Sequence, residues 1–163
     1  MNRQQILLAL ALEEAGIPVR VGQFNERLLL QKGVYLLQEA GVHLGYRYRW
    51  YLRGPYSTDL ASDVFFLAGQ MSSVRQELTG WQLDVESKGR IAALKALFGG
   101  QTLKALVKRL ELLASVLYLV RTRQASAGVP GKISEILKAN NKPFEETDVV
   151  EALGQLEQYG FAF

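Results

Sequence analysis

The chain has 163 residues, of which 48% are hydrophobic and 21% are charged, and its formal net charge is +3. This composition is typical of a globular protein that buries a core in one domain, or in a small domain with a helical extension. It contains no cysteine and a single histidine, which excludes disulfides, thiolate metal sites and a cysteine nucleophile.

Charge is unevenly distributed along the chain. Residues 1–53 carry seven Lys or Arg against four acids, and residues 101–123 carry five bases against Glu111 alone. Residues 124–163 reverse the sign, with three lysines against six acids. A basic body with an acidic C-terminal segment favours nucleic acid or an acidic protein as a partner, although many proteins of this charge bind neither.

The first helix expected has no features of a secretory signal. It lacks a basic region followed by a small-residue cleavage site, and Glu13 and Glu14 interrupt its apolar positions. The longest apolar run, residues 112–120, contains a serine and is too short to span a bilayer. We therefore expect a cytoplasmic protein that does not associate with a membrane.

Apolar periodicity predicts two N-terminal helices. The first covers residues 2–15 and ends at Gly16-Ile17-Pro18, because Pro18 moves the preceding residue out of helical geometry. The second covers about residues 25–40, with Asn25 as N-cap. Gly33 in its middle is unfavourable for a helix, which indicates close packing at that position.

An aromatic strand follows over residues 46–53, and its side chains alternate between two faces. The face expected to be buried holds Tyr46, Tyr48, Trp50 and Leu52. The face expected to be exposed holds Arg47, Arg49, Tyr51 and Arg53. We predict that Gly54-Pro55 forms a turn that ends the strand, and that Ser57 caps a helix reaching about Ala68.

The remaining elements complete a mainly α fold with a small β-hairpin or wing, in the α+β class. Residues 80–85 are predicted to pair with the aromatic strand, and Ser87 to cap a helix to residue 98. A long helix from Thr102 should form the central post, followed by helices over 132–140 and 145–159. We expect a winged-helix-like N-terminal unit over residues 1–100 and a helical extension over 101–163 that packs on it, so that the chain forms a single compact unit.

No segment predicts a catalytic site, a metal site or a cofactor. His43 is the only histidine and is interpreted as a loop residue. Asp59 and Asp63 share a helix face and could bind a cation or activate water, although Asp59 also suits the helix N-terminus electrostatically. The Gly99-Gly100 and 128–131 segments lack the spacing of phosphate-binding loops.

The arginine face of the strand is the main functional candidate. Residues two apart on a strand are separated by about 6.8 Å, near the spacing of successive phosphates on one nucleic-acid strand. Arg47, Arg49 and Arg53 could follow such a backbone, with Tyr51 stacking between them. The same row suits carboxylates of a protein partner, and it also fits a solvated edge strand protected from aggregation.

Several residues resemble a known family. They are Leu30-Gln31-Lys32, then residues 34–38, Tyr48-x-Trp50-Tyr51, and finally Gly54-Pro55-Tyr56-Ser57 with Leu60. Over about residues 5–70 this pattern resembles the SocA/Panacea type of antitoxin-associated domain, and more closely its YwgA-like branch. The resemblance implies a mainly helical domain with a small sheet that neutralises a toxin or acts as a proteolysis adaptor. The positions of this sequence to which the family pattern is carried over are Lys32, Tyr35, Trp50, Gly54, Pro55, Tyr56, Ser57 and Leu60.

Within that set, Lys32 and Tyr56 are expected to be free to contact a partner, and the others to shape the scaffold. The leading hypothesis is a non-catalytic, protein-binding module of a bacterial or archaeal cell, antitoxin-like or adaptor-like. The alternative is a winged-helix-like DNA-binding regulator. The acidic last helix pair could close over the basic surface or mediate a homodimer.

Overall fold

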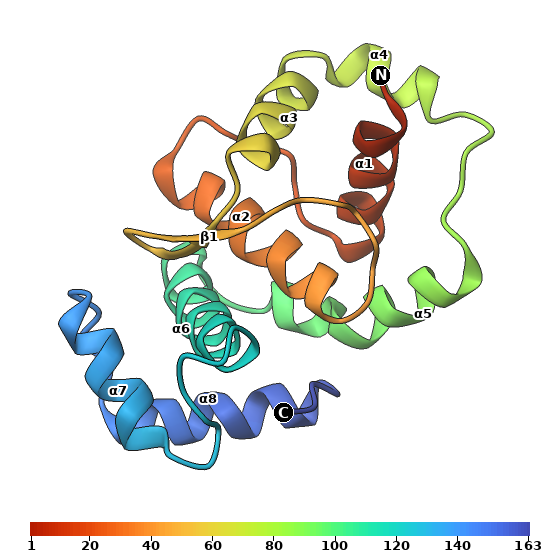
Figure 1. The fold of residues 1–163 in the computed structure, drawn as a ribbon. Helices are drawn as coiled ribbons and strands as arrows, with labels where there is room; N and C mark the ends of the chain where they lie inside the picture. The colour runs from red at the N-terminus through yellow and green to blue at the C-terminus, as the bar shows by residue number, and fades with distance from the viewer.

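The computed structural model describes all 163 residues and is mainly α-helical, as the sequence predicts, with one two-stranded antiparallel sheet (Figure 1). The elements in chain order are α1 Arg3–Ala15, α2 Phe24–Glu39, β1 Arg49–Tyr51, β2 Gly54–Tyr56, α3 Thr58–Gly69, α4 Met71–Glu77, α5 Val85–Leu94, the 3-10 helix η1 Lys95–Phe98, α6 Leu103–Arg121, α7 Pro130–Ala139 and α8 Glu146–Gln158.

Helices α2 and α6 pack against each other and form the centre of the molecule. Every residue of α2 from Leu28 to Leu37 is buried, so this helix is covered on all sides. A Cβ atom on Gly33 would lie 2.7 Å from Ile17 Cδ1, which confirms the close packing expected there. α6 also contacts β2, α7 and α8, in agreement with its predicted role as the central post.

The sheet is a tight hairpin that pairs Arg49 with Tyr56, Trp50 with Pro55 and Tyr51 with Gly54. Gly54-Pro55 was predicted to be a turn, but both residues belong to β2 and the turn is formed by Leu52-Arg53. A proline can occupy this two-stranded sheet because an edge strand tolerates the missing N–H. The predicted pairing of residues 80–85 with the aromatic strand is wrong.

Residues 78–84 form an irregular connection between α4 and α5. It ends at Asp84, whose side chain accepts a hydrogen bond from the Ser87 backbone N–H. Asp84 is thus the N-cap of α5, three residues before the predicted cap Ser87. Trp81 is half exposed and only Leu83 is buried in this segment. The weak alternation of residues 80–85 therefore reflects one anchoring side chain, and α4 was not predicted at all.

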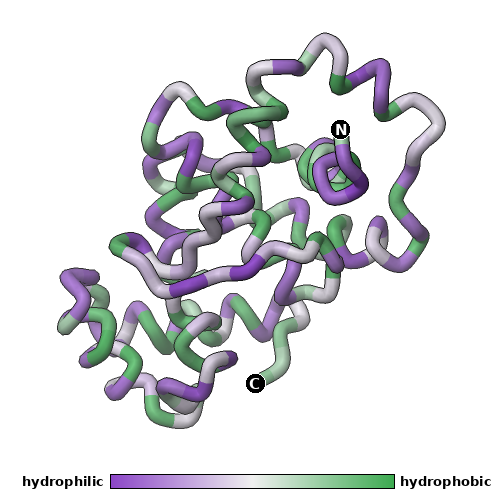
Figure 2. Tube along the Cα trace, turned by 45° about the horizontal axis from the view of Figure 1, so that its top comes forward, coloured by the Kyte–Doolittle hydropathy of each residue, from purple (hydrophilic) through white to green (hydrophobic).

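The C-terminal helices complete the same hydrophobic core as the N-terminal ones. α7 and α8 pack on each other and on α6, and Figure 2 shows hydrophobic and hydrophilic residues mixed along both. Their apolar faces join the core through Ile133, Leu137, Val149 and Leu156. Asn141 adopts a left-handed conformation (φ 60°) between the two helices and reverses the chain there.

Candidate interaction surface

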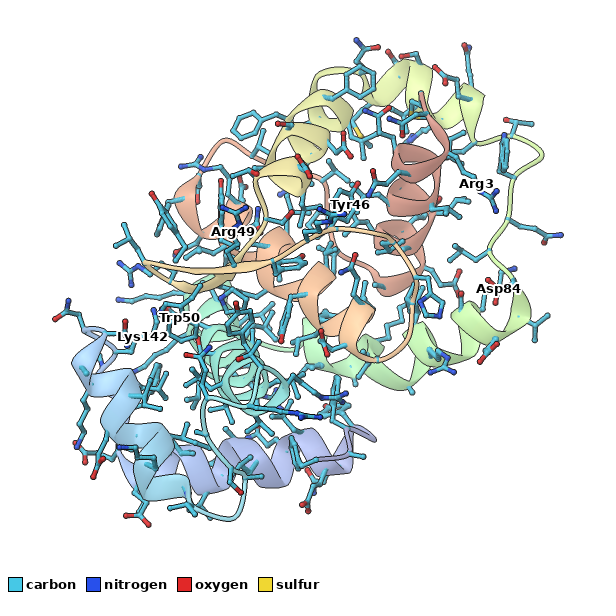
Figure 3. The ribbon with its side chains drawn as sticks, in the orientation of Figure 1. Arg3, Tyr46, Arg49, Trp50, Asp84 and Lys142 are labelled. Atoms are coloured by element: carbon cyan, nitrogen blue, oxygen red, sulfur yellow. The ribbon has the colours of Figure 1, made fainter.

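The hairpin segment, residues 46–56, consists of β1, β2, the turn between them and the extended residues before them. It presents one exposed cationic face, as the alternation of its side chains predicts. Arg47, Arg49 and Tyr51 are exposed. No carboxylate forms an ion pair with either arginine. In Figure 3 Arg49 and Trp50 lie on opposite sides of the hairpin. We call Arg47, Arg49 and Tyr51 the arginine face.

Arg53 does not continue this row. It lies in the turn, where its guanidinium is 4.0 Å from the Glu111 carboxylate and 5.7 Å from the Phe24 ring centroid. Leu52 was expected to be buried but is 76% exposed, because the turn breaks the alternation of the strand. The cationic face is therefore two arginines long, and Arg53 points toward α6 and the start of α2.

The opposite face of the hairpin segment packs on the core, as predicted. Tyr46 is buried, and the rings of Tyr48 and Trp50 pack against core residues. Tyr35 meets Tyr48 edge-on, with ring centroids 5.0 Å apart, and Trp50 lies 5.6 Å from Tyr118. Edge-on and tilted pairs of this kind stabilise beyond their buried area.

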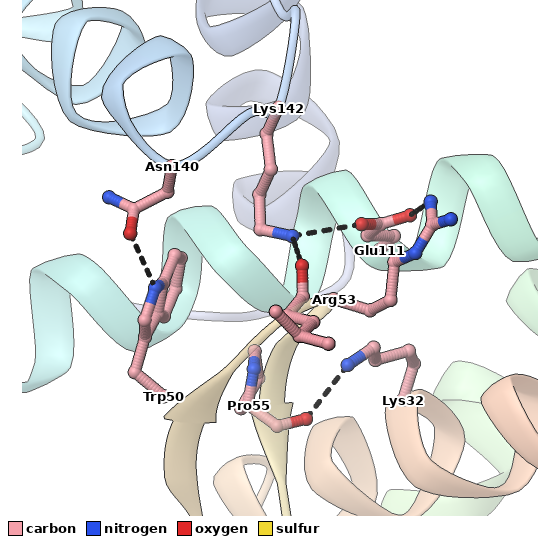
Figure 4. Close-up of polar contacts among 8 residues, drawn as sticks. Lys32, Trp50, Arg53, Pro55, Glu111, Asn140 and Lys142 are labelled. Carbon is pink, nitrogen blue, oxygen red and sulfur yellow. Dashed lines mark hydrogen bonds and ion pairs between the residues drawn. The ribbon is translucent and has the colours of Figure 1, made fainter.

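Lys32 is not free to contact a partner, contrary to the prediction. Its side chain is 1% exposed and its Nζ donates a 2.8 Å hydrogen bond to the Pro55 carbonyl (Figure 4). The pKa of Lys32 is lowered from 10.5 to about 7, mainly because the side chain is buried; Glu111 opposes this shift, and the nearby cations Lys142 and Arg53 contribute to it. The lysine of the family-like pattern thus fixes the hairpin to α2 through a buried hydrogen bond.

Tyr56, the other residue expected to contact a partner, is partly accessible. Its ring lies 5.3 Å from that of Tyr51, centroid to centroid, so the two tyrosines share a face of the hairpin. Tyr51 itself is 59% exposed. The accessible part of this tyrosine pair extends the arginine face toward α3.

A second buried lysine, Lys142, was missed by the sequence analysis and fixes the hairpin turn to the α7–α8 junction. Lys142 Nζ donates to the Leu52 carbonyl at 2.7 Å and to Glu111 Oε1 at 3.0 Å (Figure 4). Trp50 Nε1 donates to Asn140 Oδ1 at 3.2 Å, so the α7–α8 junction is bonded to both the turn and β1. One feature of the sequence could have indicated this buried ion pair. Glu111 is the only acid of residues 101–123 and lies one helical turn after Val107, so it falls on the buried face of α6 and needs a cation there.

Two glutamines of α2 fix the backbone on each side of the hairpin. Gln31 donates to the Ser57 carbonyl and accepts from the Ser57 N–H, and Gln38 makes the same pair of bonds with Tyr46. Ser57 caps α3 as predicted by accepting from the Leu60 N–H. The family-like pattern is therefore a set of positions that bonds α2 to residues 46–57.

The acidic pair of α3 has structural partners. Asp63 accepts hydrogen bonds from the Tyr46 hydroxyl at 2.7 Å and from Gln5 Nε2 at 3.0 Å. Asp59 lies in the first turn of α3 and His43 is exposed in the loop before the hairpin. No three His, Asp or Glu side chains are close enough together to hold a metal ion.

None of the helices has both the length and the apolar character needed to cross a membrane. Comparison with protein-family models, curated proteins and solved structures gives no match for this chain.

Proposed function

We propose that this protein is a non-enzymatic module that binds a protein partner through the arginine face of its hairpin. The observation that carries the proposal is a pair of exposed arginines without intramolecular ion pairs, placed on a hairpin that two buried lysines hold in position. Guanidinium groups bind carboxylates through two parallel hydrogen bonds. A surface that is already ordered before binding also avoids part of the entropic cost of association.

The resemblance to SocA/Panacea and YwgA-like domains supports an antitoxin-like or adaptor-like role. The shared residues Lys32, Gly54, Pro55 and Ser57 all build or hold the hairpin. They are the scaffold on which a binding surface would be carried, whereas Arg47 and Arg49 lie outside the pattern. We therefore assign partner recognition to the arginines and support of the hairpin to the family-like residues.

The test is affinity purification from an extract of the source cell, with a double variant and a matched control. Arg47→Ala/Arg49→Ala removes the free cations of the arginine face. Arg20→Ala/Arg75→Ala removes two exposed arginines elsewhere that also form no ion pair. A protein recovered with the parent chain and the control, but not with the arginine-face variant, supports the proposal. Equal recovery with all three chains contradicts it.

DNA binding is the second candidate, favoured by the spacing of Arg47 and Arg49 on extended chain. Because Arg53 is paired with Glu111, only two cations of the predicted row, Arg47 and Arg49, are free to release counterions from DNA. Arg47→Ala/Arg49→Ala should then reduce the slope of log affinity against log salt concentration by about two. Because α2 is buried, the helix that precedes the hairpin is not available to enter a groove of DNA. This weakens the DNA-binding candidate. Absent or salt-independent binding of duplex DNA would eliminate it.

A further inference from the structure

A groove of about 1050 Å³ opens beside the hairpin turn, between α6, α8 and the start of α2. Its apolar lining includes Leu28, Val107, Leu112 and Phe144. Phe24 also lines the groove and is 51% exposed, and the guanidinium groups of Arg27 and Arg53 lie within 6 Å of its ring centroid. The volume is at the upper end of the range of small-molecule pockets, about 300–1000 Å³.

The two helices that line this groove carry charges of opposite sign. α6 contributes the exposed side chains of Lys104 and Lys108, one turn apart. α8 contributes Asp148 and Glu151, also one turn apart. None of these four charged groups forms an ion pair within 4.0 Å. The groove is thus lined by lysines of α6 and carboxylates of α8 that form no ion pairs, and buried apolar residues such as Leu28 and Val107 form its floor. Arg109 of α6 donates a hydrogen bond to Gln155 of α8 within this lining, and Asp148 also accepts from the Glu145 N–H in the cap of α8.

This charge pattern distinguishes between classes of ligand. The backbone of a nucleic acid is uniformly negative, so its approach to Lys104 and Lys108 would bring it against the carboxylates of α8. A peptide can carry acidic side chains toward α6, basic side chains toward α8 and an apolar side chain onto the floor. Amphipathic helices bind grooves between helices in this way.

We propose that this groove binds a mixed-charge amphipathic segment of a protein partner, with acidic residues facing α6 and basic residues facing α8. The inference rests on the proposed protein-binding function and adds a second contact region with a stated partner chemistry. Phe24 and Leu28 lie where the groove meets the hairpin turn, so an apolar residue of the partner is anchored there. Arg53 and the arginine face would continue the contact beyond the groove.

The experiment selects ligands from a displayed library of random peptides about 15 residues long, which span about 22 Å when helical. The full-length protein is the target. Enriched peptides are synthesised with a fluorophore, and their affinities are measured by anisotropy. We expect enriched peptides to combine an apolar anchor with acidic and basic residues on opposite sides. A fluorescent DNA duplex is measured in parallel.

Three variants locate the peptide. Lys104→Glu/Lys108→Glu should weaken binding by about tenfold, the sum of two lost surface pairs and the new repulsion. Ala105→Trp, at an exposed position of the lining, should block the groove without changing its charge. Arg20→Glu/Arg75→Glu should leave affinity unchanged. Circular dichroism of each variant verifies that the fold is retained.

The outcomes separate this inference from the proposed function. Peptides that bind but respond only to Arg47→Ala/Arg49→Ala would overturn the groove as a site and leave the hairpin function standing. Absence of enriched peptides, together with no recovered protein in affinity purification, would overturn both. DNA binding that is lost on Lys104→Glu/Lys108→Glu would overturn the peptide as the occupant of the groove.

Discussion

At the scale of single residues, Lys32 makes stability depend on pH. Its pKa is about 7 when folded and 10.5 in the unfolded chain, so between these values the unfolded chain holds a proton that the folded chain lacks. Stability therefore rises with pH above about 7, and this gain is lost again as pH falls from 10.5 to about 7. Lys32→Met should abolish the rise, about 2 kcal/mol between pH 7 and 9 at roughly 1.4 kcal/mol per pKa unit.

Urea unfolding at pH 7 and 9 measures this effect, with Lys104→Met as the control at an exposed lysine. The window stops at pH 9 because burial raises the pKa values of Tyr35, Tyr46 and Tyr48, which makes stability fall once unfolded tyrosine ionises near pH 10. An unchanged pH dependence in Lys32→Met would mean that Lys32 is not the titrating group.

Gly54 is required for both its conformation and its missing side chain. Its φ of 92° is unfavourable for other residues, and a Cβ there would collide with Ser115 Oγ. Gly54→Ala should lower the free energy of unfolding by about 2–4 kcal/mol. Ser115 Oγ has no hydrogen-bond partner, so adding Ser115→Ala should recover the part due to the collision. Gly154→Ala in α8, with no atom within 4 Å of the new Cβ, should instead stabilise by about 0.5–1 kcal/mol.

At the scale of elements, Lys142 joins the α7–α8 junction to α6 and to the hairpin turn. Lys142→Met removes the cation that is hydrogen-bonded to the buried Glu111 and leaves Arg53 at 4.0 Å, and we expect a loss of about 3 kcal/mol in the free energy of unfolding in urea. Glu111→Leu/Lys142→Met removes both charges and should recover most of this loss. Lys138→Met, which breaks the exposed pair with Glu145, should cost less than about 1 kcal/mol. Similar losses in both single variants would contradict the buried role of Lys142.

The elements also show what local pattern can and cannot predict. The positions of helices α2 and α6 could be predicted from the apolar periodicity of the sequence. The exposure of Arg47 and Arg49 could be predicted from strand alternation. The burial of Lys32 and Lys142 does not, because a lysine is buried only when a distant carbonyl or carboxylate meets it, and no spacing along the chain encodes that contact. Gly54-Pro55 has the composition of a turn, but its tertiary contacts with α2 and α6 place it in a strand.

At the scale of the whole molecule, one core includes apolar residues of both α1–α5 and α7–α8, so the chain should unfold as a single cooperative unit. Trp50 lies where β1 meets the α7–α8 junction, and Trp81 lies in the α4–α5 connection. In Trp81→Phe, fluorescence reports Trp50 alone, while far-ultraviolet circular dichroism reports all helices. Because separating α7 and α8 from α6 would expose Ile133, Leu137 and Leu156, we expect identical denaturant midpoints for the two signals. A Trp50 transition at lower denaturant would show that the C-terminal helices detach first, and the groove would then be lost before the arginine face.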